Sequence, residues 1–180
     1  MDLNLADQYY LKASNYYPYN LEFAIENLNY ALSYDDEHPS ANCLSGMIFM
    51  YHLKDFEKAA DSFYAALKYD INYPETYKHY SLLRLWEGEF DRAQKIIDRG
   101  MQVRCMDKSS LLIIQAIKHE WEGNFSESKM VLLRAKLLSV DNEKIEEIDS
   151  YLSRIKDKLK TQKAIKKVRR NRLAALRKSS

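Results

Sequence analysis

The sequence predicts an all-α fold, an array of helical hairpins followed by one long helix. A pattern of bulky and small residues at spacings of three, four and three recurs four times, at intervals of 35, 34 and 35 residues. Its copies are Leu21-Ala24-Leu28-Ala31, Phe56-Ala59-Phe63-Ala66, Phe90-Ala93-Ile97-Gly100 and Phe125-Ser128-Leu132-Ala135. The 180 residues include only 4 Gly and 3 Pro, a composition that favours helix. A period of about 34 residues is typical of stacked helical hairpins.

Each copy of the pattern predicts the second helix of a hairpin, because its spacings place the four side chains on one helix face. The small residues fit where two helices cross closely. We therefore expect second helices over 21–34, 56–69, 90–104 and 125–138. The first helices that precede them are expected over 3–16, 39–52, 74–87 and 109–121.

The joints between these helices carry signals for helix ends. Gly88 and Gly123 fall where a helix C-terminus favours positive φ. Pro39 and Pro74 suit the first turn of a helix, where a missing N–H costs little. The joint from Tyr51 to Phe56 is one residue longer than its equivalents. The predicted N-caps are Asn20, Asp55 and Asn124.

A long helix is expected over 143–178, after Asp141 and Asn142. Its apolar residues follow steps of three and four, which makes a seam able to seal the last hairpin. The seam consists of Ile145, Ile148, Tyr151, Leu152, Ile155 and Leu159. We therefore expect four hairpins over 1–140 and a separate basic helix or tail over 141–180.

Charge is divided unevenly along the chain. Residues 1–153 hold 16 Lys/Arg and 25 Asp/Glu, a net −9, whereas 154–180 hold 12 Lys/Arg and one Asp, a net +11. The tail is open to four interpretations: a solvated end, docking on an acidic protein surface, phosphate contact with nucleic acid, and attachment to a membrane surface. Its candidate cations are Lys163, Lys166, Lys167, Arg169, Arg170, Arg172 and Arg177.

The 34-residue hairpins, the small residues at their crossings and joints such as Trp-Glu-Gly-Glu-Phe (86–90) resemble the tetratricopeptide repeat (TPR) family over residues 3–138. The resemblance implies a right-handed solenoid whose first helices line a concave groove, with the final helix as a cap. Mapping the family's groove positions onto this chain gives an apolar, aromatic surface. The groove residues so implied are Tyr10, Tyr17, Met47, Met50, Tyr51, Leu82, Trp86, Ile117 and Trp121.

An apolar groove suits an amphipathic helix or an extended hydrophobic segment of a protein partner. We therefore expect a non-catalytic protein–protein interaction module, acting as an adaptor, chaperone or assembly factor. One alternative is a structural homo-oligomer in which a C-terminal helix fills the groove. Another is a nucleic-acid-associated factor that uses the basic tail.

The sequence offers little for chemistry. The four histidines lie on different elements without the i, i+4 spacing of a helical metal site, so we expect no metal, cofactor or catalytic residue. We interpret Cys43 and Cys105 as reduced core or groove thiols. With an acidic N-terminus and no apolar run of about 18 residues, they indicate a cytoplasmic protein without a transmembrane segment.

Overall fold

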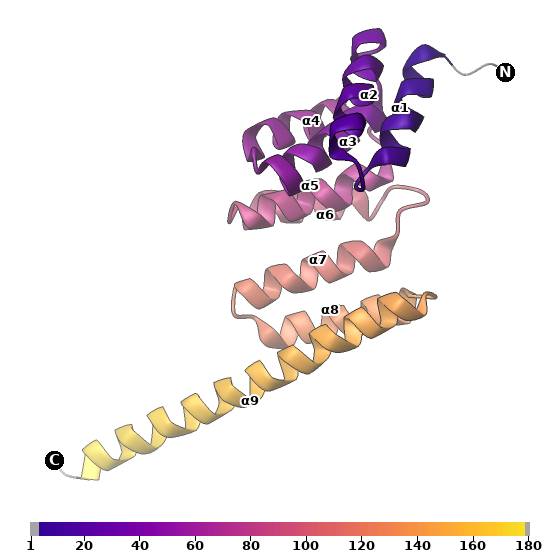
Figure 1. Cartoon of the computed structure of the whole chain (residues 1–180). Coiled ribbons are helices and arrows are strands. Elements are labelled where there is room, and N and C mark those ends of the chain that lie inside the picture. Colours follow the sequence, from indigo (N-terminus) through magenta and orange to yellow (C-terminus); the bar gives the residue numbers. More distant parts are fainter. Residues whose placement is uncertain (1–3, 179–180) are drawn as a thin grey trace. The chain divides into compact units, whose positions relative to one another are not determined.

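The computed structural model describes the backbone of residues 4–178 and the side chains of residues 4–172. Every regular element in these residues is helical (Figure 1). The chain divides into two compact units, Met1–Asp107 and Lys108–Ser180. This division falls between the third and fourth predicted hairpins, after an irregular segment over 101–107, and differs from the expected boundary at residue 140.

The first unit contains three hairpins. Their first helices, α1, α3 and α5, contact one another in sequence (Figure 1). Each second helix packs on its own first helix, and α2 and α4 also pack on the first helix that follows, α3 and α5. The elements are α1 (Leu5–Tyr16), α2 (Leu21–Tyr34), α3 (Pro39–Ile48), the π-helical turn η1 (Phe49–Leu53), α4 (Phe56–Tyr69), α5 (Pro74–Trp86) and α6 (Phe90–Gly100).

The predicted crossing residues are buried where the two helices of each hairpin meet. Ala24, Ala59 and Ala93 have no exposed surface. At the equivalent position in the fourth copy, the hydroxyl of Ser128 donates to the Ala116 carbonyl at 2.8 Å, which satisfies a polar group inside the crossing. Small side chains are needed here because larger ones would force the helices apart.

Most of the predicted caps are confirmed. Gly88 and Gly123 have φ of 76° and 79°. The Oδ1 atoms of Asn20 and Asp55 accept from the N–H groups three residues on, at 3.3 and 3.1 Å. Asn124 stands at the N-cap of its helix, but its side chain makes no capping hydrogen bond.

Two helix ends differ from expectation. The longer second joint is absorbed by η1 and by Lys54 in the left-handed conformation, so that the Asp55 N–H bonds to the Phe49 carbonyl at 3.1 Å. Helix α6 ends at Gly100, before residue 104, because glycine is a poor helix former and Val103 turns inward to be buried. Cys43 is a buried core thiol as expected, whereas Cys105 is exposed in the segment after α6.

The second unit contains α7 (Lys108–Trp121), α8 (Phe125–Leu138) and α9 (Asn142–Lys178). Helix α9 packs on α8 and begins 34 residues after α7, in phase with the repeat. It therefore resembles the first helix of a fifth hairpin. The predicted seam is confirmed, since Ile148 and Ile155 are fully buried. With 37 residues against 14 in α7, α9 runs past the hairpin that it covers (Figure 1).

In the described part of the chain, no helix combines the length and the apolar character that a membrane crossing requires.

Candidate functional site

The three first helices of the first unit bring most of the predicted groove residues of that unit together. The ring of Tyr51, at the end of α3–η1, meets the Trp86 ring of α5 edge-on, with centroids 5.7 Å apart and planes at 85°. Tyr17, at the end of α1, lies close enough to the Tyr51 phenol to raise its pKa. We call this surface the aromatic face. It consists of Tyr10, Tyr17, Met47, Tyr51, Tyr73, Leu82 and Trp86.

A chain of hydrogen bonds fixes Tyr51 in place. Its hydroxyl lies 2.7 Å from His79 Nδ1, and His79 Nε2 lies 2.9 Å from Glu75 Oε1. Burial, with smaller effects of the neighbouring Tyr17 and Glu75, raises the pKa of Tyr51 to about 12. The phenol therefore stays protonated and can donate to Nδ1, which leaves the Nε2 proton for the Glu75 carboxylate.

Glu75 anchors the outer end of this chain. The hydrogen bond from His79 lowers the pKa of Glu75, against the opposing effect of burial, and Lys78 at 3.8 Å lowers it further. The carboxylate is consequently ionised at neutral pH, and it favours a donor on His79. The result is a rigid Tyr51 ring held by polar groups from two turns of α5.

Trp86 is the most exposed of the large aromatic residues on this face, with 38% of its surface accessible. The Lys54 ammonium lies over its ring at 5.6 Å, and the Phe56 ring lies 6.1 Å away on the other helix of the second hairpin. Lys54 reaches the ring from the left-handed position that ends η1. The extra residue of the second joint therefore places a cation beside the tryptophan.

The opposite end of the aromatic face is formed by Tyr10 and Tyr73. The Tyr10 ring contacts the ring of His38 at 5.2 Å, and His38 Nε2 lies 3.0 Å from Asp7 Oδ1. Burial raises the pKa of Tyr73, and Tyr10 and Ser40 lie close enough to its phenol to influence that pKa. These contacts connect α1 to the start of α5 through the turn that opens α3.

Met47 and Leu82 form the apolar floor of the face. Both are half-buried against a cluster that includes Cys43, Phe63 and Leu83. The prediction that Met50 lines the groove is wrong. Its side chain has no exposed surface and belongs to the buried cluster. Met50 and Tyr51 both lie in the π-helical turn η1, which departs from the spacing of a regular α-helix and turns Met50 toward the interior.

The remaining predicted groove residues lie in the second unit. Ile117 is half-buried on α7, and Trp121 at the end of that helix is 50% exposed. The aromatic face is therefore defined on the first unit alone.

The predicted cations of the basic tail also belong to the second unit. Those exposed on α9 are Lys163, Lys166, Lys167, Arg169, Arg170 and Arg172. The side chain of Arg177 lies outside the described residues.

Sequence reasoning missed the polar part of the face. It treated His79 as an isolated histidine, although Glu75 stands four residues before it on a predicted helix, a spacing that allows contact. The partner Tyr51 is 28 residues away and could be found only by aligning neighbouring first helices. Among the described residues no group of three or more His, Cys, Asp or Glu is placed to hold a metal ion.

Comparisons with known proteins identify the fold. Neither the protein-family models nor the curated proteins include a match to this chain. Among solved structures, it is similar to PilW, described as a widely conserved type IV pilus biogenesis factor. That match has a TM-score of 0.68 and 16% identity, and it covers 88% of this chain and 80% of PilW.

MamA and PilF of Pseudomonas aeruginosa each match with a TM-score of 0.61 and 18% identity. The MamA match covers 84% of this chain and 82% of MamA, and the PilF match covers 87% of this chain and 76% of PilF. At these identities the likeness concerns the fold. The chain therefore has an all-α, TPR-like fold of repeated helical hairpins.

Proposed function

We propose that this protein is a non-catalytic interaction module, an adaptor, chaperone or assembly factor that holds a segment of a partner protein on the aromatic face. The observation that carries the proposal is the edge-on contact of Tyr51 with Trp86, together with Tyr17, which lies close enough to the Tyr51 phenol to raise its pKa. The three residues come from three successive first helices. Tyrosine and tryptophan in such settings contribute most of the binding energy at protein interfaces.

The face is suited to binding because its side chains are already held in place. Tyr51 is fixed by His79, and Trp86 is bracketed by Tyr51, Phe56 and Lys54, so little side-chain freedom remains to be lost on binding. Met47 and Leu82 between the rings can adapt to apolar side chains of different shapes. An amphipathic helix or an extended segment with two or three apolar residues fits this surface.

The assembly part of the proposal is supported by the likeness to PilW, a type IV pilus biogenesis factor of similar fold. We also propose that the protein acts in the cytoplasm, where its two free thiols would remain reduced.

The alternative of a homo-oligomer, in which a C-terminal helix of one copy fills the groove of another, makes a different prediction. A chain that stops after Lys160 keeps the buried seam of α9, and its mass in solution would fall only if the removed helix holds copies together.

The test is a pair of charge substitutions on the floor of the face. Peptides are first selected from a random display library on the wild-type chain. The variant with Met47→Glu and Leu82→Glu should then bind them at least about tenfold more weakly, because each peptide must bury an apolar group against a new carboxylate.

The matched control carries Tyr64→Glu and Ile71→Glu, which add the same charge at exposed apolar positions elsewhere on the first unit. The control should bind the selected peptides like the wild type. If the control loses binding and the double variant keeps it, the binding surface lies elsewhere and the proposal is wrong.

A further inference from the structure

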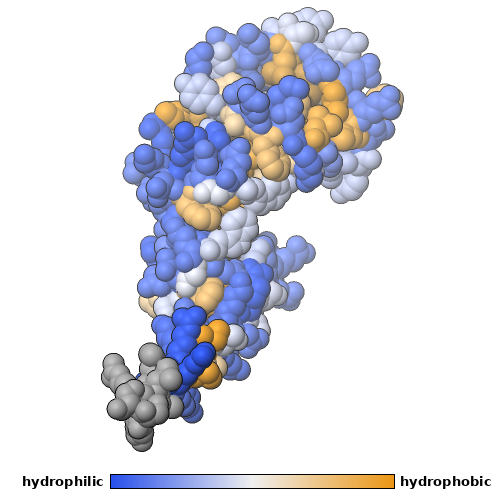
Figure 2. Space-filling model, turned by 90° about the vertical axis from the view of Figure 1, so that its left-hand side faces the viewer, coloured by the Kyte–Doolittle hydropathy of each residue, from blue (hydrophilic) through white to orange (hydrophobic). Residues whose placement is uncertain are grey.

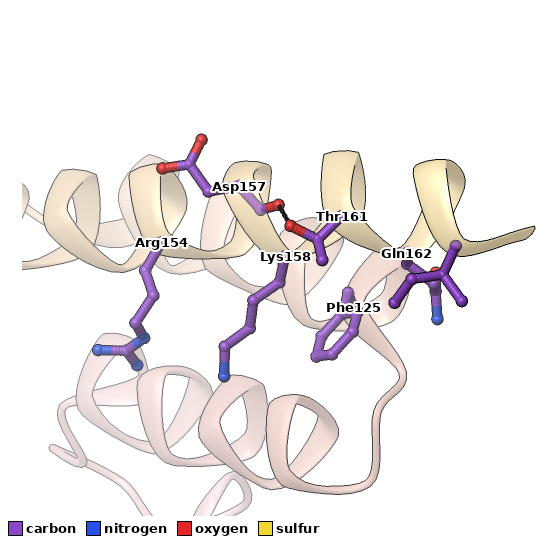
Figure 3. A pocket seen from close by; sticks show the side chains of 7 residues that line it. Phe125, Arg154, Asp157, Lys158, Thr161 and Gln162 are labelled. Atoms are coloured by element: carbon purple, nitrogen blue, oxygen red, sulfur yellow. Dashed lines mark hydrogen bonds between the residues drawn. The ribbon is translucent and has the colours of Figure 1, made fainter. Parts of the chain in front are cut away.

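The second unit carries a crevice that the aromatic face does not include. Helix α9 runs antiparallel to α8 and passes Phe125, the first residue of α8. There the Lys158 ammonium of α9 lies 5.7 Å from the centroid of the Phe125 ring. Beyond this point α9 has no second helix to pack on, and a space of about 520 Å³ opens beside Phe125. Its wall comes from Phe125, Arg154, Asp157, Lys158, Thr161, Gln162 and Ile165 (Figure 3).

The wall of this crevice is mainly apolar because its basic residues are already paired. Arg154 donates to both carboxylate oxygens of the buried Glu120, at 2.8 and 2.7 Å, and Lys158 Nζ lies 2.7 Å from Glu120 Oε1. Burial would raise the pKa of Glu120, but these hydrogen bonds lower it below its usual value. The methylene stems of both bases therefore line the crevice while their charged ends are held (Figure 3).

The helix beyond the crevice has two different faces. At 100° per residue, Val168, Arg169 and Arg172 continue the face of Thr161 and Ile165. Ile165 and Val168 are 48% and 66% exposed, which is unusual for β-branched apolar residues without a partner. In Figure 2, apolar and strongly hydrophilic atoms lie side by side on α9 just before the grey end.

The other face of the helix is purely basic. Lys163, Lys166, Lys167 and Arg170 border a shallow depression of their own. Within the described residues, neither these four nor the two arginines of the crevice side form an ion pair, and all are exposed. Ile165 and Val168 thus form an apolar strip that begins at the crevice and is flanked by the unpaired Arg169 and Arg172.

We propose that the crevice and the helix face beyond it form a second docking site, which takes an acidic amphipathic helix of another protein. One large apolar side chain of that helix fills the space beside Phe125, and its carboxylates pair with Arg169 and Arg172. Charge complementarity selects this occupant. A second copy of α9 is disfavoured because residues 154–180 carry a net +11. A nucleic-acid backbone would use all the cations and gain nothing from the apolar strip.

The probe is a labelled peptide of about 18 residues that forms an amphipathic helix, with Leu and Phe on one face and Glu on both flanks. A peptide of the same composition in scrambled order is its control. The full-length wild-type chain should bind the ordered peptide at least about tenfold more tightly than the scrambled one in a fluorescence anisotropy titration. Equal binding of the two peptides, or binding of neither, would overturn the proposal.

Substitutions on exposed positions of α9 test the crevice itself without threatening the fold. Ile165→Gln removes the apolar wall, and Thr161→Trp fills the space, so each should weaken binding of the ordered peptide about tenfold. Ala164→Gln, on the neighbouring face, should change it less than about twofold. If all three variants bind like the wild type, the crevice is not the site.

Two charge-matched double variants separate a docked helix from general attraction. Arg169→Gln with Arg172→Gln should weaken peptide binding about tenfold, whereas Lys163→Gln with Lys167→Gln, on the far face, should weaken it about twofold at most. Equal losses would refute docking on one face. A single-stranded RNA of about 20 nucleotides that bound more tightly than the peptide and lost affinity equally in both variants would indicate nucleic-acid binding instead.

The aromatic face serves as an independent reference. The variant with Met47→Glu and Leu82→Glu should bind the acidic peptide like the wild type, because its changes lie in the other unit. Loss of peptide binding in this variant would mean that the peptide occupies the aromatic face, which contradicts a separate site on α9.

Discussion

Replacing Gly46 by alanine is the sharpest test of the packing that holds the aromatic face. A Cβ at this position would lie 2.5 Å from Phe63 Cε1 and 2.6 Å from Cδ1, closer than real carbon contacts. Phe63 has no exposed surface and is enclosed by the rings of His79 and Tyr80 at 6.4 and 5.8 Å. The ring has nowhere to move without displacing His79, which holds Tyr51.

The net effect combines two opposing contributions. Overpacking of a tight core costs about 1–3 kcal/mol, while replacing a helical glycine by alanine returns about 1 kcal/mol. We therefore expect Gly46→Ala to lower the free energy of unfolding of the first unit by up to about 2 kcal/mol. Denaturant unfolding, with Trp86 in that unit as the fluorescent reporter, measures this change.

A double-mutant cycle shows whether the clash is the cause. Phe63→Leu makes room for the new methyl group, so the variant with both substitutions should be more stable than the sum of the single changes predicts, by about 1 kcal/mol or more. Additive effects of the two substitutions would refute the close approach. Ser81→Ala, at the corresponding position of the next repeat, should be nearly neutral because a side chain is already accommodated there.

Three further predictions concern other parts of the chain. Because the pKa of Glu120 is lowered in the folded state, its stabilisation is present above the unfolded pKa of about 4.3 and is lost as pH falls through the folded value. Glu120→Gln should therefore cost the second unit about 2 kcal/mol at pH 7 but much less in acid, as reported by Trp121 fluorescence. Tyr51→Phe should cost about 1 kcal/mol in denaturant unfolding and weaken peptide binding to the aromatic face, because the ring loses its anchor. Met130→Lys with Leu137→Gln, the residue types at the same positions of the third repeat, should change thermal stability by less than about 0.5 kcal/mol each, since both side chains are exposed on α8.

The repeat in the sequence was sufficient to predict the helices. Its period aligned four second helices whose starts agree with the structure, and the positive φ of Gly88 follows from its place after a helix. These features are local, because spacing and capping are determined by residues within a few positions of one another.

What the sequence could not reveal depends on contacts between distant elements. The π-helical turn absorbs the extra residue of the second joint and decides that Tyr51, and not Met50, faces outward. The sequence shows that the joint is one residue longer, but it does not show where the extra residue is accommodated. The hydrogen bond between Tyr51 and His79 joins two residues that are 28 positions apart and lie on different helices. The crevice at Phe125 exists because α9 continues straight where earlier first helices end, and helix propensity alone does not show what lies beside that continuation.

Site-specific photo-cross-linking tests the central claim most directly. A benzophenone amino acid is placed at position 17 or 86 on the aromatic face and, as control, at position 64, which is 64% exposed on α4. Cross-linked segments are then identified by mass spectrometry after exposure to peptides selected on the wild-type chain. We predict that the same peptide segment is captured from positions 17 and 86 and not from 64. Capture from position 64 alone, or equally from all three, would contradict binding on the aromatic face.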